Sequence, residues 1–376
     1  MADAILMSAG SFDCGDMLYA LGGYLVFDPV VYLEIEGRVT VVVSELDRRR
    51  AMAELRLASE IWSDAEFDAD GWPALTLAVL RRAGLDRVAV PGWYPVARAD
   101  YLRAAGVEVV VDEDVIARRR RHKRPDEVAA ISDSLRVAER SLSHARSLLA
   151  GSEIGPDGTL SFQGQPLTSE VVQGEIRSVW SLNGCEGDAP VLAGGPQGAH
   201  VYEMGSGVLR AGEPILCDLF PRHGVSRYYA DITRVFCVGE PPDKLCRVHE
   251  AVRGALELAR QTCRSGIPGN RVFERVCEYL GGLGYAPTDP SHSGEGVQVA
   301  PYLGHGLGLD VHEMTTGPDP SIPFPLETGD VVTIEPCLYE YGWGAVRLED
   351  VVVITDDGCE TLTRFDYDLS VVPSGS

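Results

Sequence analysis

The sequence predicts two domains, an α/β domain of residues 1–120 followed by an α+β domain of residues 121–376. The chain has 376 residues, which is more than one domain of about 100–200 residues requires. In the first part, apolar β-branched runs alternate with helical segments. In the second part, two long amphipathic segments precede a region of strands and glycine-rich loops that begins at Pro190.

The first domain opens with a predicted β-hairpin. Two apolar runs with β-branched residues, 24–34 and 38–43, flank Glu36-Gly37, and a glycine between such runs is typical of a hairpin turn. Helical propensity and the Pro- and Gly-rich turn at 91–95 predict the other elements of this domain. The remaining expected elements are helices at 45–59 and 98–105 and strands at 87–90 and 107–111.

A run of basic residues, Arg118–Arg124, marks the boundary between the domains. Such a run could bind nucleic acid or be a targeting signal. The formal net charge of −23, however, repels nucleic acid and anionic membranes. We therefore interpret the run as a solvated linker that contacts acidic side chains, and we expect neither nucleic acid nor a membrane as a partner.

The second domain begins with two predicted amphipathic helices. Pro125 suits a first helical turn, and apolar residues then recur at helical spacing through 126–149. Thr168 is a plausible N-cap for a helix over 168–180. The later expected elements are a loop at 151–166, strands at 214–220, 226–238, 330–338 and 344–354, and helices at 244–263 and 271–281.

The cysteines and the apolar runs indicate the compartment. Nine cysteines are scattered without a CxxC pair, which favours buried free thiols over a disulfide framework. No run of about 18 apolar residues predicts a transmembrane helix. The first residues lack the basic start and apolar stretch of a signal peptide. We therefore expect a cytoplasmic protein.

The candidate functional residues centre on a glycine-rich run, Gly304–Glu313, that contains His305 and His312. Glycine lets the backbone approach a ligand closely, and histidine binds metals and carries protons near neutral pH. Four acidic residues lie on the two sides of this run in strand-like contexts: Asp218, Asp231, Glu335 and Glu349.

This combination of residue types predicts a metal site. The interval from Asp218 to Asp231 suits a hairpin that brings both to one end, and Glu335 and Glu349 fall on adjacent predicted strands. Four carboxylates and one imidazole would be balanced by two divalent cations, whereas buried carboxylates without such partners would take up protons. Oxygen ligands with one imidazole suit Mn, Co, Fe or Zn, and we expect manganese. Two such ions activate a water for hydrolysis without a protein nucleophile.

The residues from about Pro125 to Val372 resemble the pita-bread metallopeptidases, the group of methionine aminopeptidase, aminopeptidase P and prolidase. The motifs HGxGxxxHE, ADxTR, xIEP and RxED carry this resemblance. The first domain resembles the creatinase-type N-terminal domain of aminopeptidase P and prolidase. By this likeness, the metal ligands are Asp218, Asp231, His305, Glu335 and Glu349, and the other catalytic residues are His200, His312 and Arg347.

The resemblance implies a dinuclear Xaa-Pro peptidase. A metal-bridging hydroxide would attack the bond between an N-terminal residue and proline in a short peptide, with Glu335 moving the proton. The family's usual assembly implies a homodimer. Whether the enzyme is an aminopeptidase P or a dipeptidase stays open. Two alternatives are a creatinase-like hydrolase of a small C–N substrate and a non-catalytic binding module of the same fold. Pro301 stands where aminopeptidase P often has a histidine, and Asp218 is followed by Leu219-Phe220-Pro221 in place of the usual Asp-x-Gly.

Overall fold

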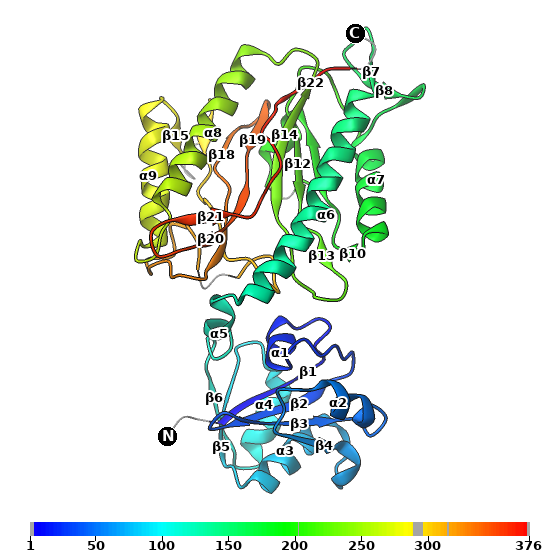
Figure 1. Ribbon diagram of the computed structural model, residues 1–376, viewed down its shortest axis with the longest axis vertical. Helices are drawn as coiled ribbons and strands as arrows, with labels where there is room; N and C mark the ends of the chain where they lie inside the picture. The colour runs from blue at the N-terminus through cyan, green and yellow to red at the C-terminus, as the bar shows by residue number, and fades with distance from the viewer. Residues whose placement is uncertain (1–3, 202, 289–295, 314–315, 374–376) are drawn as a thin grey trace. The chain divides into compact units, whose positions relative to one another are not determined.

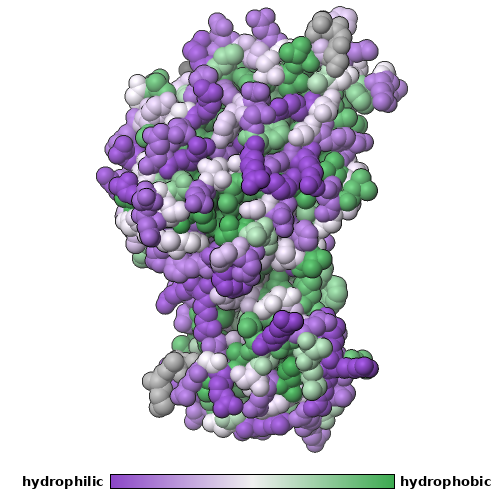
Figure 2. All heavy atoms as spheres, in the orientation of Figure 1, coloured by the Kyte–Doolittle hydropathy of each residue, from purple (hydrophilic) through white to green (hydrophobic). Residues whose placement is uncertain are grey.

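The computed structural model describes residues 4–201, 203–288, 296–313 and 316–373. The chain forms two compact units, Met1–Arg120 and Arg121–Ser376 (Figure 1). On the face seen in Figure 2, hydrophilic side chains cover most of the surface and hydrophobic ones occur in small groups. Among the described residues, none of the helices has the length and apolar character needed to cross a bilayer.

The first unit is built on a six-stranded mixed sheet in the order β4-β3-β2-β1-β5-β6. Its strands are β1 (Ala4–Ala9), β2 (Val30–Ile35), β3 (Arg38–Val43), β4 (Glu60–Ser63), β5 (Arg87–Val90) and β6 (Glu108–Val111). Its helices are α1 (Gly15–Ala20), α2 (Arg48–Glu54), the 3-10 turn η1 (Asp64–Glu66), α3 (Gly71–Ala83) and α4 (Val96–Ala104), and α5 (Ala117–Arg121) lies at its end.

Helices cover both faces of this sheet. Successive side chains of a strand point to opposite faces, so neighbouring residues of one strand pack with different helices. In β1, Leu6 packs with apolar residues of α3 and α4. Its neighbours Ile5 and Met7 pack instead with residues of α1 and α2. The expected hairpin turn is confirmed, since Glu36 and Gly37 both have positive φ between β2 and β3.

The second unit contains several small sheets. The two largest have the strand orders β11-β12-β14-β22 and β15-β16-β18-β19, and a third has the order β17-β20-β21. The strands are β7 (Glu153–Ile154), β8 (Leu160–Phe162), β9 (Gln165–Pro166), β10 (Cys185–Glu186), β11 (Val191–Gly194), β12 (Ile215–Leu219), β13 (Arg222–His223), β14 (Ile232–Val238), β15 (Ala286–Pro287), β16 (Gln298–Val299), β17 (Val331–Ile334), β18 (Cys337–Glu340), β19 (Gly344–Arg347), β20 (Asp350–Ile354), β21 (Cys359–Thr361) and β22 (Ser370–Val371).

Two pairs of helices enclose these sheets (Figure 1). In β14, Ile232 and Phe236 pack with apolar residues of one pair, α6 and α7. Val235 and Cys237 of the same strand face the other way and pack with α8 and α9. The helices of this unit are α6 (Pro125–Ala150), α7 (Ser169–Leu182), the 3-10 turn η2 (Gly195–Ala199), α8 (Asp243–Thr262) and α9 (Gly269–Gly282). The sheets are therefore buried between helices on two sides.

Local signals in the sequence set several element boundaries correctly. Pro125 is the first residue of α6, and the Thr168 hydroxyl accepts a hydrogen bond from the backbone N–H of Val171 at the start of α7. Other expectations were wrong. The expected loop at 151–166 contains the short strands β7, β8 and β9, and β1 and α3 were not expected at all.

The expected solvated linker is also largely wrong, because the basic run pairs with carboxylates and part of it is buried. Arg120 is buried in the first unit and forms an ion pair with Asp16 at 2.7 Å. In the second unit, Arg121 binds the fully buried Asp330 at 2.8 Å. The expected contact with acidic groups is thus present, but the side chains of Arg120, Arg121 and Lys123 are largely shielded from solvent.

Candidate metal centre

The first two predicted ligands lie at one end of an antiparallel strand pair. Asp218 is in β12, and Asp231 comes immediately before β14. The register places Asp218 opposite Thr233 and Leu219 opposite Ile232. The hairpin therefore brings the two carboxylates to the same end, as their spacing predicted. The strand expected from residue 226 begins only at Ile232, so Asp231 belongs to the connection and not to the strand.

The next two predicted ligands face each other across a second hairpin. The expected long strands are each interrupted, because β17 pairs with β20 and β18 pairs with β19. Ile334 stands opposite Asp350, and Cys337 stands opposite Arg347. Two unpaired residues separate the paired segments on each side, so an equal residue count sets Glu335 level with Glu349, although their backbone N–H groups donate to Leu303 and Thr233. Like charges directly opposite on paired strands repel each other.

His305 reaches this hairpin through the glycine-rich run. Its backbone N–H donates to Thr333 Oγ1 at 3.1 Å, next to β17. A Cβ at Gly304 would come within 2.1 Å of the Thr333 carbonyl oxygen, so only glycine fits there. The His305 Nδ1 lies 3.0 Å from the carbonyl oxygen of Gly306. Because a carbonyl can only accept, Nδ1 carries the proton and Nε2 keeps a lone pair for a metal.

The ligand atoms of these residues converge inside the second unit. One ligand atom each of Asp231, His305 and Glu349 lie within 4.8 Å of one another. The His305 Nε2 atom is 3.6 Å from Asp231 Oδ2 and 3.5 Å from Glu335 Oε1. The Arg347 guanidinium forms an ion pair with the Asp218 carboxylate. All five predicted ligands are buried.

Burial and mutual repulsion disturb the acidity of this group. Burial, followed by the charges of Glu349, Asp218 and Glu335, raises the pKa of Asp231 well above its usual value. Burial and neighbouring carboxylates likewise raise the pKa of Glu349. Burial raises the pKa of Glu335 to about 7. Burial lowers the pKa of His305, which favours its neutral, metal-binding form.

Arg347 and Thr233 support the carboxylates. The Arg347 Nη1 atom is 3.8 Å from Glu335 Oε2, and its Nε donates to Thr233 Oγ1 at 3.1 Å. The Thr233 hydroxyl in turn donates to Glu349 Oε2 at 2.8 Å. Thr233 was not predicted as a functional residue, although it lies in the same ADxTR motif as Asp231, two residues further on.

The donor set fits divalent cations. When ionised, the four buried carboxylates outnumber the single guanidinium that faces them, and a pair of dications would offset this excess of negative charge. Within the described part of the chain, the Asp218 Oδ1 atom is buried and has no hydrogen-bond partner. A buried acceptor without a partner is costly unless something else binds it. Oxygen donors with one imidazole are also the ligand chemistry of such metals.

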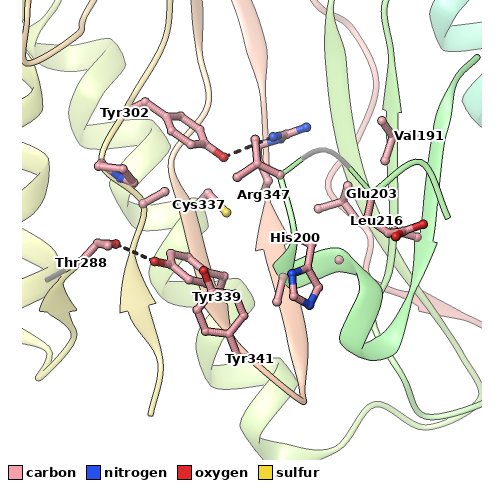
Figure 3. A pocket seen from close by; sticks show the side chains of 16 residues that line it. Val191, His200, Glu203, Leu216, Thr288, Tyr302, Cys337, Tyr339, Tyr341 and Arg347 are labelled. Carbon is pink, nitrogen blue, oxygen red and sulfur yellow. Dashed lines mark hydrogen bonds between the residues drawn. The ribbon is translucent and has the colours of Figure 1, made fainter. Parts of the chain in front are cut away.

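A cavity of about 460 Å³ lies beside Arg347 (Figure 3). Tyr302 accepts a hydrogen bond from Arg347 at 3.4 Å, and Thr288 and Tyr339 are joined by a hydrogen bond of 2.9 Å. The wall is mainly apolar and aromatic, and its other side chains include those of Val191, Ala193, Leu216, Ala300, Pro301, Cys337 and Tyr341. The cavity thus offers an apolar surface next to the charged centre.

The two other predicted histidines lie at different places around the centre. The His312 ring packs edge-on against His305, with 4.3 Å between the ring centroids. Partial loss of hydration, followed by the effect of His305, lowers the pKa of His312. His200 lies at the cavity, 5.3 Å from the Tyr341 ring. Among the described residues, no hydrogen bond or ion pair joins His200 to the five predicted ligands.

Comparison with known proteins adds a family and a fold. The model of metallopeptidase family M24 matches residues 130–356. The probable dipeptidase PepE of Mycobacterium tuberculosis is 27% identical over 371 residues, which cover 95% of this chain and 90% of that protein. The Xaa-Pro dipeptidase of Pyrococcus furiosus is 29% identical over 203 residues, 53% of this chain and 54% of that protein.

Solved structures resemble almost the whole chain. An X-Pro aminopeptidase from Thermotoga maritima has a TM-score of 0.81 at 21% identity and covers 98% of this chain and 97% of its own. A prolidase from Pyrococcus horikoshii has a TM-score of 0.78 at 22% identity, with coverages of 98% and 95%. At this identity the likeness concerns the fold, and it confirms the expected α/β creatinase-like domain followed by an α+β pita-bread domain.

Proposed function

Because the chain belongs to metallopeptidase family M24, we propose that it hydrolyses the bond between an N-terminal residue and proline in short peptides. The observation that carries the proposal is the convergence of Asp231, His305 and Glu349, where Glu335 lies level with Glu349 in the hairpin. Like-charged partners in a buried register need a cation between them. We assign catalysis to the domain of residues 121–376 and leave residues 1–120 as a creatinase-like N-terminal domain.

Five residues would hold two divalent cations. Asp231, His305 and Glu349, whose ligand atoms already gather, would hold the first. Glu335 lies beside His305, and Asp218 has the buried oxygen without a partner, so both are available to complete the pair. When bound, such a pair supplies an activated water and polarises the scissile carbonyl. Mostly oxygen ligands favour Mn, with Co, Zn or Fe as alternatives.

Glu335 would accept the proton of the attacking water and pass it to the leaving nitrogen. Its backbone N–H donates to the Leu303 carbonyl oxygen at 2.7 Å, which fixes the residue between β17 and β18. Its carboxylate lies 3.5 Å from His305 Nε2 and therefore next to the reacting atoms. A carboxylate within hydrogen-bond reach of water can act as a general base and then as a general acid.

The other three catalytic candidates surround the same space. His312 would donate a hydrogen bond to the carbonyl oxygen or the new amine, because its ring adjoins His305. His200, at the cavity, would contact the substrate from the other side. Arg347 orients Asp218 and Glu335 and borders the cavity, so it would keep the carboxylates in place.

The cavity and the names of the relatives support the proposed substrate class. An apolar and aromatic wall suits the pyrrolidine ring of proline and a neighbouring apolar side chain. The similar proteins include an Xaa-Pro dipeptidase and a probable dipeptidase. The name of the probable dipeptidase, which does not mention proline, favours a second candidate function. This function is a dipeptidase that does not require proline.

A peptide panel tests the proposal. The protein, loaded with Mn(II), is offered Xaa-Pro dipeptides, Xaa-Pro-Xaa tripeptides and matched peptides with alanine in place of proline. Release of the N-terminal residue from proline peptides supports the proposal, and the ratio of dipeptide to tripeptide turnover separates the two subclasses. Equal turnover of the alanine peptides supports the general dipeptidase. No hydrolysis of any peptide by metal-loaded protein rejects both and favours a creatinase-like C–N hydrolase.

Assembly and compartment complete the proposal. All nine cysteines are free, and free thiols persist in reducing compartments, which supports a cytoplasmic location. The family resemblance supports a homodimer. Light scattering at several protein concentrations measures the molar mass, and a value near twice 40.6 kDa is the expected result.

A further inference from the structure

Lysine is rare in this chain, and one of its lysines is deeply buried. Only two of the 33 basic residues are lysines, Lys123 and Lys244. Lys123 stands in a run in which every other cationic position but His122 is arginine. Its side chain is 1% exposed. A buried ammonium is costly unless it is paired, so this lysine holds its place for a specific contact.

The contact is with the glutamate that follows His312. The Lys123 Nζ atom lies 2.5 Å from Glu313 Oε2, and the Glu313 side chain is 6% exposed. The other carboxylate oxygen, Oε1, accepts the backbone N–H of Leu309 at 3.0 Å. Both oxygens of Glu313 are thus bound, one by the ammonium and one by the glycine-rich run itself.

Glu313 closes the run that carries both histidines. Its backbone N–H donates to the Gly306 carbonyl oxygen at 2.8 Å. A Cβ at Gly308 would come within 2.4 Å of Glu313 Oε1, so the carboxylate fills the space inside the loop. His312 directly precedes Glu313, and its ring meets His305 with the planes at 84°. A shift of Glu313 would therefore move His312 relative to His305.

Lys123 is itself fixed to the sheet next to the centre. Its backbone N–H donates to the Gly329 carbonyl oxygen at 2.9 Å. The preceding Arg121 binds Asp330 at 2.8 Å, immediately before β17. The backbone at Lys123 is therefore held by residues 329–330, which lead directly into β17, the strand that ends just before Glu335.

We propose that Lys123 is a positioning residue for peptide hydrolysis, because its buried ammonium holds Glu313 and thereby sets the His312 imidazole beside His305. The inference rests on the proposed function only where activity is measured. A compact ammonium suits this enclosed carboxylate, whereas the larger planar guanidinium of arginine needs a wider, forked site. This explains a lysine in a run of arginines.

The variant that tests the proposal removes both charges at once. Lys123→Met alone leaves a buried carboxylate without its cation and destabilises the protein, so it is paired with Glu313→Gln. We expect the double variant to melt near the parent temperature and to bind the same amount of metal. We also expect kcat to fall about 10–100-fold, as for a misplaced catalytic group, with KM nearly unchanged. Lys244→Met, at the chain's other lysine, is the matched control and should keep the parent kcat.

Combination with His312→Ala separates positioning from general damage. If Lys123 acts through His312, K123M/E313Q causes little further loss of kcat in the His312→Ala background, because effects along one chain of contacts are not additive. A full additive loss in that background overturns the proposal. A parent-like kcat in the K123M/E313Q variant also overturns it.

A readout on metal-free protein decides the same point without activity. With ¹⁵N-labelled histidine, the His312 imidazole signals are assigned by their absence in His312→Ala. We expect them to shift or broaden in K123M/E313Q and to stay unchanged in Lys244→Met. Unchanged His312 signals in K123M/E313Q overturn the proposal. If the parent hydrolyses no peptide, the proposed function fails, and these spectra still decide whether Lys123 positions His312.

Discussion

The Thr233 hydroxyl links the two sides of the centre, because it donates to Glu349 Oε2 at 2.8 Å and accepts from Arg347 Nε at 3.1 Å. Thr233 stands opposite Asp218 in the β12–β14 pair. One hydroxyl therefore connects a predicted ligand to the arginine that holds another. A residue of this kind orients metal ligands without being a ligand itself.

Removing this hydroxyl should weaken the centre without unfolding the protein. Thr233→Val keeps the shape of the side chain but breaks both hydrogen bonds. We expect activity or metal affinity to fall about 10–100-fold, measured by peptide turnover and metal titration. Thr262→Val, at a position where the hydroxyl donates within α8 to the Leu258 carbonyl oxygen, should change neither. A Thr233→Val enzyme with parent turnover and affinity would contradict this role.

Loss of a ligand should have a larger effect. Glu349→Ala removes a buried carboxylate from the cluster with Asp231 and His305. We expect bound metal to fall and turnover to drop about 1,000-fold or more, since metal catalysis supplies several kcal/mol. Elemental analysis and peptide assays measure the two effects. Glu250→Ala, at an exposed position of α8, is the control. Parent-like activity of Glu349→Ala at equal metal supply would rule out its role as a ligand.

Metal removal should reverse the pH dependence of stability. In the metal-free protein, burial raises the pKa of Glu335 from 4.5 to about 7, so the folded state holds the proton more tightly than the unfolded state. The stability from this group is fully present below about pH 4.5 and is lost as the pH rises through about 7. The raised pKa values of Asp231 and Glu349 act in the same direction.

We therefore expect the melting temperature of chelator-treated protein to fall as the pH rises from about 5 to about 8. Metal-saturated protein should not show this fall, because bound cations stabilise the ionised carboxylates. Calorimetry on both preparations measures the difference. Glu335→Gln, which cannot ionise, should lessen the fall in the metal-free state. Parallel pH profiles for the two preparations would contradict the prediction.

The cysteines should react with alkylating agents in the order of their exposure. Cys246 is exposed, whereas Cys217 and Cys263 are buried. Burial raises the pKa of Cys217 and of Cys263, so their reactive thiolate form is scarce. Under native conditions near neutral pH, iodoacetamide should label Cys246 first, and the other two only after unfolding. Peptide mass spectrometry measures the rates, and equal labelling of Cys217 and Cys246 would refute the expected burial.

A methyl group at Gly308 should disturb the histidine run. Its Cβ would come within 2.4 Å of Glu313 Oε1, so Gly308→Ala should displace that carboxylate. We expect turnover to fall about 10–100-fold with little loss of bound metal. Gly281→Ala, in α9 with nothing near the new methyl, is the control. Full activity in Gly308→Ala would show that the carboxylate can move without consequence.

Much of the candidate metal centre could be predicted from the sequence, because its residues are concentrated in short motifs. The spacing of Asp218 and Asp231 predicted a hairpin, and the structure has one. Glu335 and Glu349 were expected on adjacent strands, and they lie level with each other in the short unpaired stretch between two strand pairs. The roles of these residues as ligands and catalysts stay predictions, but their proximity follows from local patterns.

Other features depend on contacts that local patterns do not encode. The strand β1 was missed, although it lies inside the sheet of the first unit between β2 and β5. Its pairing comes from residues distant in the sequence. The ion pair of Lys123 with Glu313 spans 190 residues, so no window of sequence could show it. The ion pair of Arg347 with Asp218 likewise joins residues that are 129 positions apart.

The equal number of residues between the paired segments around Glu335 and Glu349 has a consequence for how this protein can vary. Because two residues separate the paired segments on each strand, deleting or inserting one residue on one side alone would shift every later partner by one position. Alternate side chains would then exchange faces, and a carboxylate would turn away from His305. This hairpin should tolerate substitutions that preserve its chain length, but not insertions or deletions, whereas the loops that close its far end should accept both.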